Sequence, residues 1–211
     1  MLTKLQQIWK AKDIRNKIIY VLLLLVVFRI AAHIPVPGVN VGDLRSYFEG
    51  NQVLGLLNLF SGGAMQNFSI VMLGVGPYIT ASIIFQLLVM IVPKLEALQK
   101  EGEYGRQKIN QYTRILTIPL AFIQGYAFIR LLSSQTGGRF LADISPMQLA
   151  TTMVIITAGT IFLMWLGELI TEKQIGNGIS LLIFAGIVAR LPQSLLNTIA
   201  AFDRGMVLNL L

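Results

Sequence analysis

Long apolar runs recur along the chain at lengths that match the thickness of a lipid bilayer. A membrane-spanning helix needs about 20 mostly apolar residues. Five segments meet or approach this length, namely 18–34, 70–92, 115–132, 147–166 and 179–199. Arg190 and Pro192 interrupt the last segment, so we expect a short fifth span whose arginine reaches an interface. The pattern predicts an all-α polytopic membrane protein.

Charges between the apolar runs predict how these helices are oriented. Cations concentrate in 1–17 and 93–114, whereas 35–60 and 133–146 carry only Arg45 and Arg139. Because cytoplasmic loops are enriched in Lys and Arg, the N-terminus and 93–114 are predicted to be cytoplasmic, with 35–60 and 133–146 outside. Alternation places 167–178 in the cytoplasm. Arg29 then lies near the outer end of its helix, where we expect it to extend to the interface.

The two ends of the chain predict further elements. In 1–17, apolar residues recur at helical spacing against a basic face, which favours a helix lying on the inner membrane surface. A frayed tail is the alternative. Segment 200–211 turns apolar again after Asp203 and Arg204, so we expect the start of a sixth span there.

Composition supports the membrane prediction and narrows the chemistry. The 211 residues are 55% hydrophobic with a mean hydropathy of +0.68, and 13% are charged, against about 25% in a typical soluble domain. The absence of cysteine excludes disulfides and thiolate sites. The net charge of +7 could suggest a nucleic-acid partner, but the cations flank the apolar runs, as topology requires. No HExxH or GxSxG motif is present, and His33 has no partner at metal-ligand spacing. We therefore expect no enzyme activity, catalytic residue, metal or cofactor.

The stretch SGGAMQNFSIVMLGVGPYITASIIFQLLVMIVP (61–93) is broken by Gly74, Gly76 and Pro77. Backbone groups freed at membrane depth must be paired by protein or face a water-filled cavity. One interpretation is a short helix over 64–73, a glycine hinge, and a new helix with Pro77 in its first turn, where its missing N–H is harmless. The other is a continuous helix kinked at the proline. The residues alone leave both open.

Two aliphatic stripes follow glycine breaks. Val75, Ile79 and Ile83 recur at i, i+4, and Ile179 and Ile183 repeat this spacing after the turn Gly176–Gly178. Such stripes face lipid or a protein core more often than a pore. Broken helices also occur in secondary transporters, although the spans lack the buried acidic residues or lysines that ion coupling requires. A structural anchor would leave the glycine breaks unexplained.

Four blocks of the sequence together resemble one known family. In chain order they are FRIAAHIPVPGV, SGGAMQNFSIVMLGVGPYITASIIFQLL, KEGEYGRQKINQYTR and GTIFLMWLGELITEKQIGNGISLLIFAGIVA. They resemble the end of the first helix, the plug and second helix, the first large cytoplasmic loop, and the fourth to fifth helices of SecY, the central subunit of the bacterial protein-conducting channel. SecY has ten spans in two halves. The resemblance implies that this chain corresponds to the N-terminal half, with the hinge between the halves and the start of a sixth helix in 200–211.

The resemblance also implies roles for individual residues. The pore ring would comprise Val75, Ile79, Ile83, Ile179 and Ile183. The plug (61–73) would include Gly62, Gly63, Ala64, Met65, Phe68, Ile70 and Leu73, with a hinge at Gly74, Gly76 and Pro77, and with the second span following over 74–92. Thr80 and Gln124 match lateral-gate positions, although each is also an ordinary interhelical hydrogen-bonding residue. A cytoplasmic partner surface would include Lys100, Arg106, Lys108 and Arg114, any of which could equally be a topology determinant on a solvated loop.

Function and partners follow from the same resemblance. The family forms a channel that moves unfolded secretory polypeptides across the membrane and releases transmembrane segments laterally into lipid. Expected partners are SecE-like and SecG-like small membrane subunits, the SecA motor and the ribosome on the cytoplasmic side, signal peptides and translocating polypeptides, the C-terminal half of the channel, and the lipid bilayer. The expected location is the bacterial inner membrane.

Overall fold

The computed structural model describes residues 11–37, 61–135 and 145–189, together with Phe48, Asn58 and Pro192. Every named element in these ranges is an α-helix, so the all-α prediction is confirmed. The helices are α2 (Lys12–Ala31), α5 (Gly76–Ile91), α6 (Pro93–Lys100), α7 (Glu103–Gln135), α9 (Pro146–Glu172) and α10 (Gly178–Val188). Most of the predicted interfacial helix, the second half of the fifth span, and all of 200–211 lie outside the described residues.

Two of the described helices are long and apolar enough to cross a bilayer. These are Glu103–Ser134 of α7 and Pro146–Glu172 of α9. Helix α5 has only 16 residues, so it makes a third span only when it is taken together with α6. The chain bends by 101° between the two helices. Pro93 begins α6 and cannot donate the hydrogen bond that would continue α5, while Val92 is extended with φ −100° and ψ 108°. By length and composition, the described residues therefore account for two or three of the five predicted spans.

The two remaining predicted spans fall short of this test for different reasons. Helix α2 has 20 residues, but Lys12, Asp13, Arg15 and Lys17 occupy its first turns. Helix α10 is strongly apolar but has only 11 residues.

Helix α7 begins well before the apolar run that marked it. Its first residue is Glu103, so most of the predicted loop 93–114 is helical, as α6 and the first three turns of α7. Lys, Glu, Gln and Arg are good helix formers, and nothing in 103–114 breaks the helix. Hydropathy marks where a helix leaves the membrane and does not mark where the helix ends.

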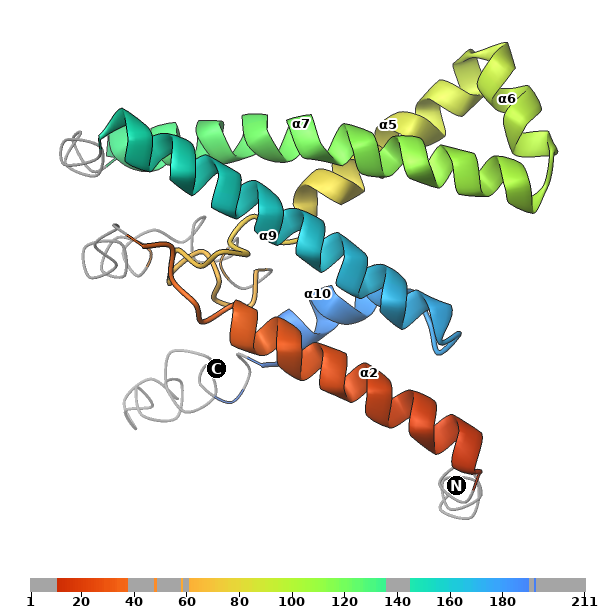
Figure 1. Ribbon diagram of the computed structural model, residues 1–211, viewed down its shortest axis with the longest axis horizontal. Helices are drawn as coiled ribbons and strands as arrows, with labels where there is room; N and C mark the ends of the chain where they lie inside the picture. Colours follow the sequence, from red (N-terminus) through yellow and green to blue (C-terminus); the bar gives the residue numbers. More distant parts are fainter. Residues whose placement is uncertain are drawn as a thin grey trace, which may run out of the picture.

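Helix α9 is the centre of the assembly. It contacts α2, α5, α7 and α10, and Figure 1 shows it crossing beside the long rod of α7 with α2 running along its other side. In an 18-residue apolar stretch of α9, 56% is buried inside the protein, against 28% in the corresponding stretch of α7. Ser145 starts the helix through a reciprocal capping box with Gln148. Helix α9 is therefore the scaffold that positions the other elements.

Residues 61–75, hereafter the turn segment, correct the prediction of a short helix. They form successive turns rather than a helix over 64–73. Phe68 has a positive φ of 44°, and two backbone hydrogen bonds tie the segment to the chain just after α2: Val36 N–H to Phe68 O (2.9 Å) and Ile70 N–H to Ile34 O (3.0 Å). These hydrogen bonds to a distant segment and the left-handed conformation of Phe68 are incompatible with a regular helix. The continuous kinked helix is also wrong, because α5 begins only at Gly76, with Pro77 in its first turn as expected.

The buried core has two parts. One joins α2, the start of α5, α9 and α10, and includes Phe28, Val75, Leu166 and Leu182. The other lies under the turn segment, against the C-terminal half of α7 and the N-terminal half of α9. It includes Phe68, Met72, Ile129, Leu132, Met153 and Ile156. At this second core the backbones touch, since a Cβ on Gly159 would lie 1.9 Å from the carbonyl oxygen of Ile70.

Candidate functional site

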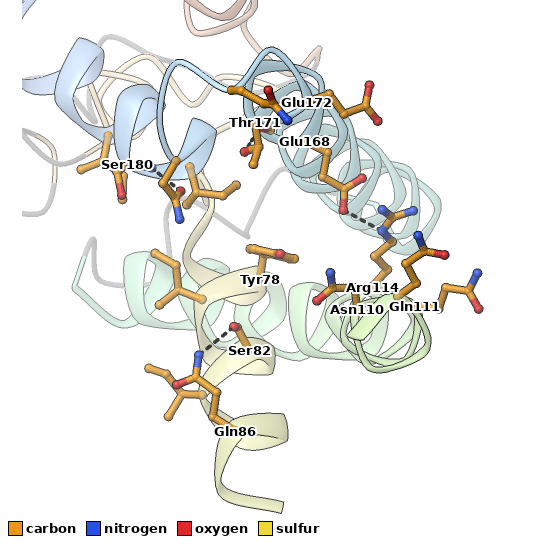
Figure 2. Close-up of a pocket in the computed structure, with 18 residues that line it drawn as sticks. Tyr78, Ser82, Gln86, Asn110, Gln111, Arg114, Glu168, Thr171, Glu172 and Ser180 are labelled. Atoms are coloured by element: carbon orange, nitrogen blue, oxygen red, sulfur yellow. Dashed lines mark hydrogen bonds and ion pairs between the residues drawn. The ribbon is translucent and has the colours of Figure 1, made fainter. Parts of the chain in front are cut away.

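A cavity of about 810 Å³ opens where α7 begins, α9 ends and α10 begins. Figure 2 shows side chains from α5, α7, α9 and α10 surrounding it. On α7 and α9 it lies at the helix ends opposite to those that carry the turn segment, because its lining includes Asn110 and Glu168 whereas the second core contains Ile129 and Ile156. The cavity and the turn segment therefore occupy opposite ends of the bundle.

Isoleucines from two helices form the apolar part of the cavity. Ile79 and Ile83 of α5 and Ile179 and Ile183 of α10 all line it. Ile79, Ile179 and Ile183 also pack against the first core, which contains Val75, only 7% exposed. The structure thus brings together the two stripes that the sequence places about 100 residues apart, although Ile83 remains 50% exposed. Their role as a pore ring stays a prediction.

The rest of the lining is polar and comes largely from residues that sequence analysis missed. Carboxamides, hydroxyls and a few charges project from the first turns of α7, the end of α9, the α9–α10 turn and the middle of α5 (Figure 2). They include Ser82, Gln86, Gln107, Asn110, Gln111, Thr171, Gln174 and Asn177. Positions 107, 110, 111 and 114 share one helix face. This polar stripe is the sequence pattern that could have indicated the polar wall of the cavity.

An ion pair joins two helices across the edge of the cavity. Arg114 Nε of α7 lies 2.6 Å from Glu168 Oε1 of α9, with side chains 47% and 21% exposed. The dashed line between Arg114 and Glu168 in Figure 2 marks it. Arg114 was predicted as part of a cytoplasmic partner surface, yet the structure places it in the cavity wall with an internal partner.

The other three predicted surface cations lie on α6 and the first turns of α7. Lys100 pairs with Glu96 at 2.6 Å, and this hydrogen bond and the lysine charge hold the pKa of Glu96 below its ordinary value. Lys108 Nζ lies 5.7 Å from the centre of the Tyr104 ring. Arg106 is exposed. Exposed ion pairs contribute little stability, so these cations remain available to a partner.

The predicted gate residues meet between α5 and α7. Gln124 Nε2 lies 3.5 Å from Thr80 Oγ1, which itself donates to the carbonyl oxygen of Gly76 at 3.1 Å. The first contact is at the long end of hydrogen-bond distances and is weak. The structure thus shows that the two residues are neighbours, and their gate role stays a prediction.

The predicted plug residues are mostly packed away. Gly62, Gly63, Ala64 and Phe68 are buried, and Met65, Ile70 and Leu73 are half-buried. At the predicted hinge, Gly74 has a φ of +60°, which disfavours other residues, and nothing lies within 4 Å of a Cβ placed on Gly74 or Gly76. The segment is therefore seated in apolar surroundings, next to a junction with free space.

Comparison with known proteins identifies the family. The SecY family model matches residues 69–211. The protein translocase subunit SecY of Bacillus licheniformis is 48% identical over 196 residues, covering 92% of this chain and 45% of its own length. The corresponding subunit of Streptomyces galbus is 46% identical over 206 residues, covering 92% and 47%. That of Pseudomonas aeruginosa is 51% identical over 178 residues, covering 83% and 40%. The chain spans about half the length of the curated relatives it matches. Its helices, the block order of its sequence and these matches establish that this membrane protein belongs to the SecY family.

Proposed function

We propose that this chain forms one wall of a protein-conducting channel through which unfolded polypeptides cross the membrane. The observation that carries the proposal is the cavity, whose polar walls end at isoleucines from two helices that both begin at a glycine. Its curated relatives are named protein translocase subunits. The opposite wall would come from the remainder of the channel, as the C-terminal half.

The proposed path has three zones. Carboxamides and hydroxyls at the polar end keep the entry hydrated. Half of an apolar constriction is formed by Val75, Ile79, Ile179 and Ile183, with Ile83 one turn further along α5. The constriction resists ions because it excludes water, and its flexible side chains close around a polypeptide of any sequence. Residues 61–73 of the turn segment lie beyond them and form the plug, which closes the path at rest and leaves its seat during transport.

The surroundings of this path fit the same function. Thr80 and Gln124 would belong to a lateral gate, where a weak polar contact between α5 and α7 yields to a sufficiently apolar segment. The cytoplasmic side would carry the cations of α6 and α7, among them Lys100, Arg106 and Lys108, as a docking surface for a SecA-like motor or a ribosome. Small SecE-like and SecG-like subunits would complete the assembly in a bacterial inner membrane.

Site-specific crosslinking tests the proposed path directly. The chain contains no cysteine, so Ile79→Cys or Ile183→Cys places one thiol in the complete channel. A secreted polypeptide stalled midway should form adducts at both positions. Leu23→Cys on α2 and Val154→Cys on α9, whose native side chains are 59% and 63% exposed, are matched controls that should form none. Labelling of the controls but not of positions 79 and 183 would rule out this path.

A further inference from the structure

Arg29 is a cation in an unexpected place. It occupies the last turn of α2, whereas Lys12, Arg15 and Lys17 lie in the first turns. In the proposed orientation, these three cations lie at the cytoplasmic end of α2 and Arg29 lies at its external end. This is against the usual enrichment of Lys and Arg on the cytoplasmic side. From the sequence, its side chain is expected only to reach the membrane interface. The structure corrects this, because the side chain turns inward and is half-buried.

The guanidinium of Arg29 binds the turn segment. Its Nη1 donates to the carbonyl oxygen of Gly62 at 2.5 Å, across 33 residues of sequence. In the part of the chain that the structure describes, the three ion pairs all involve other residues. The charge is therefore directed to a backbone acceptor, and a hydrogen bond from an ionised donor is about twice as strong as one between neutral groups.

Gly62 presents this carbonyl from a tightly constrained position. Its φ is +65°, and a Cβ built on it would lie 2.9 Å from the Cα atom of Gly186 in α10. The next amide, Gly63 N–H, donates to the carbonyl oxygen of Asn58 at 2.9 Å. The start of the turn segment is thus inserted between the end of α2 and the backbone of α10.

The backbone hydrogen bonds between the turn segment and the chain just after α2 are of a different kind. The bridge between Pro35 and Ser69 consists of backbone hydrogen bonds, which most side chains at those positions would permit. The bond from Arg29 depends on one side chain and on the absence of a side chain at position 62. Apolar side chains of α2, among them Phe28, also share the first core with Val71 and Val75 of the turn segment, but the bond from Arg29 is directed to Gly62, where the segment begins.

We infer that Arg29 is a positioning residue that holds the start of the turn segment in its seat between α2 and α10. The inference rests on the proposed function only where it equates the seated segment with the closed channel. A hydrogen bond from a charged donor contributes more to stability than one between neutral groups. Loss of this bond should therefore raise the unseated population about tenfold or more.

Thiol labelling of the complete channel in membrane vesicles, with no substrate present, measures this population. Asn67→Cys places a reporter in the half-buried middle of the segment. In that background, Arg29→Gln should raise the rate of reaction with a polar maleimide about tenfold. Arg130→Gln is the matched control, since Arg130 lies near the end of α7 and bonds to Tyr126 of its own helix at 2.9 Å. It should leave the rate unchanged.

The conservative variant Arg29→Lys separates the bond from the bare charge. Lysine keeps the cation and its effect on topology but loses the planar fork of donors, so its labelling rate should lie between those of the native chain and Arg29→Gln. It also keeps the test valid if the glutamine variant fails to accumulate, because a rate equal to that of the native chain would then overturn the inference. An unchanged rate in Arg29→Gln would overturn it as well.

Transport activity is scored separately. If Arg29→Gln raises labelling tenfold and also raises the resting ion conductance of the channel, the seated segment is the closed form. If labelling rises while the native complete channel carries no polypeptide, the positioning role of Arg29 stands and the proposed function fails.

Discussion

The same two helices line a polar cavity at one end of the bundle and an apolar core at the other. At one end, α7 and α9 present Asn110, Gln111, Arg114 and Glu168 to an open, polar cavity. At the other, the same two helices present Ile129, Leu132, Met153 and Ile156 to a dry core that holds the turn segment. The isoleucines of α5 and α10 lie at the inner edge of the polar end.

The difference lies in what each end can tolerate. The dry end depends on close packing, which includes direct contact between the backbones of Gly159 and Ile70, and protein interiors accommodate added volume poorly. The polar end depends on solvated groups and one partly exposed ion pair, which water can replace. Substitutions should therefore lower the free energy of unfolding most near the turn segment and least around the cavity.

The largest effect is expected for Gly159→Ala at the dry end. The new Cβ would lie 1.9 Å from the carbonyl oxygen of Ile70 and 2.7 Å from its carbonyl carbon, so α9 and the turn segment must separate. Overpacking of this kind costs about 1–3 kcal/mol, occasionally more. We expect a clearly lower temperature of unfolding for the complete channel in detergent, together with faster thiol labelling at Asn67→Cys.

Gly125→Ala in α7 is the control for this prediction. Its added Cβ would meet only side chains of Leu73, Met153 and Ile156, at 3.5–3.8 Å, which is ordinary contact. It should be neutral or slightly stabilising, because alanine has the higher helix propensity. Equal losses of stability in the two variants would show that the backbone contact at Gly159 is not what makes the dry end sensitive.

A smaller effect is expected from the ion pair at the polar end. Arg114→Gln or Glu168→Gln removes a partner of a pair that is 47% and 21% exposed, so the coupling between α7 and α9 should change by up to about 1 kcal/mol and weaken with salt. A double-mutant cycle on the unfolding temperature at two salt concentrations measures this. A coupling of several kcal/mol, insensitive to salt, would contradict the picture of a solvated end.

The smallest effect is expected between α5 and α7, where Gln124 contacts Thr80 at 3.5 Å. Thr80→Val with Gln124→Leu should show a coupling of about 0.6 kcal/mol, typical of polar contacts between membrane helices. The functional readout is more sensitive, since a gate held by this contact should admit less apolar signal sequences once both residues are replaced. Unchanged signal selectivity would remove the pair from the proposed gate.

Local sequence patterns predicted much of the helical layout. The apolar runs anticipated α7 and α9, Pro77 anticipated the first turn of α5, and the i, i+4 spacing anticipated which isoleucines share a face. These features are local, so a few neighbouring residues suffice to specify them. The length of α7 was missed because a polar helical extension has no hydropathy signal, and the bend at Val92–Pro93 was missed although the proline was visible.

What the sequence determined by itself was the membrane character, the breaks at glycine and proline, and the segregation of cations, because each depends on side-chain type and spacing along one stretch of chain. Only the tertiary structure decided that residues 61–75 form turns, that Arg114 faces Glu168, and that Arg29 reaches Gly62. Each of these joins groups at least 33 residues apart or replaces helical hydrogen bonds with bonds to a distant strand of chain. The free energy of such contacts depends on how whole helices pack, and no local pattern contains that information.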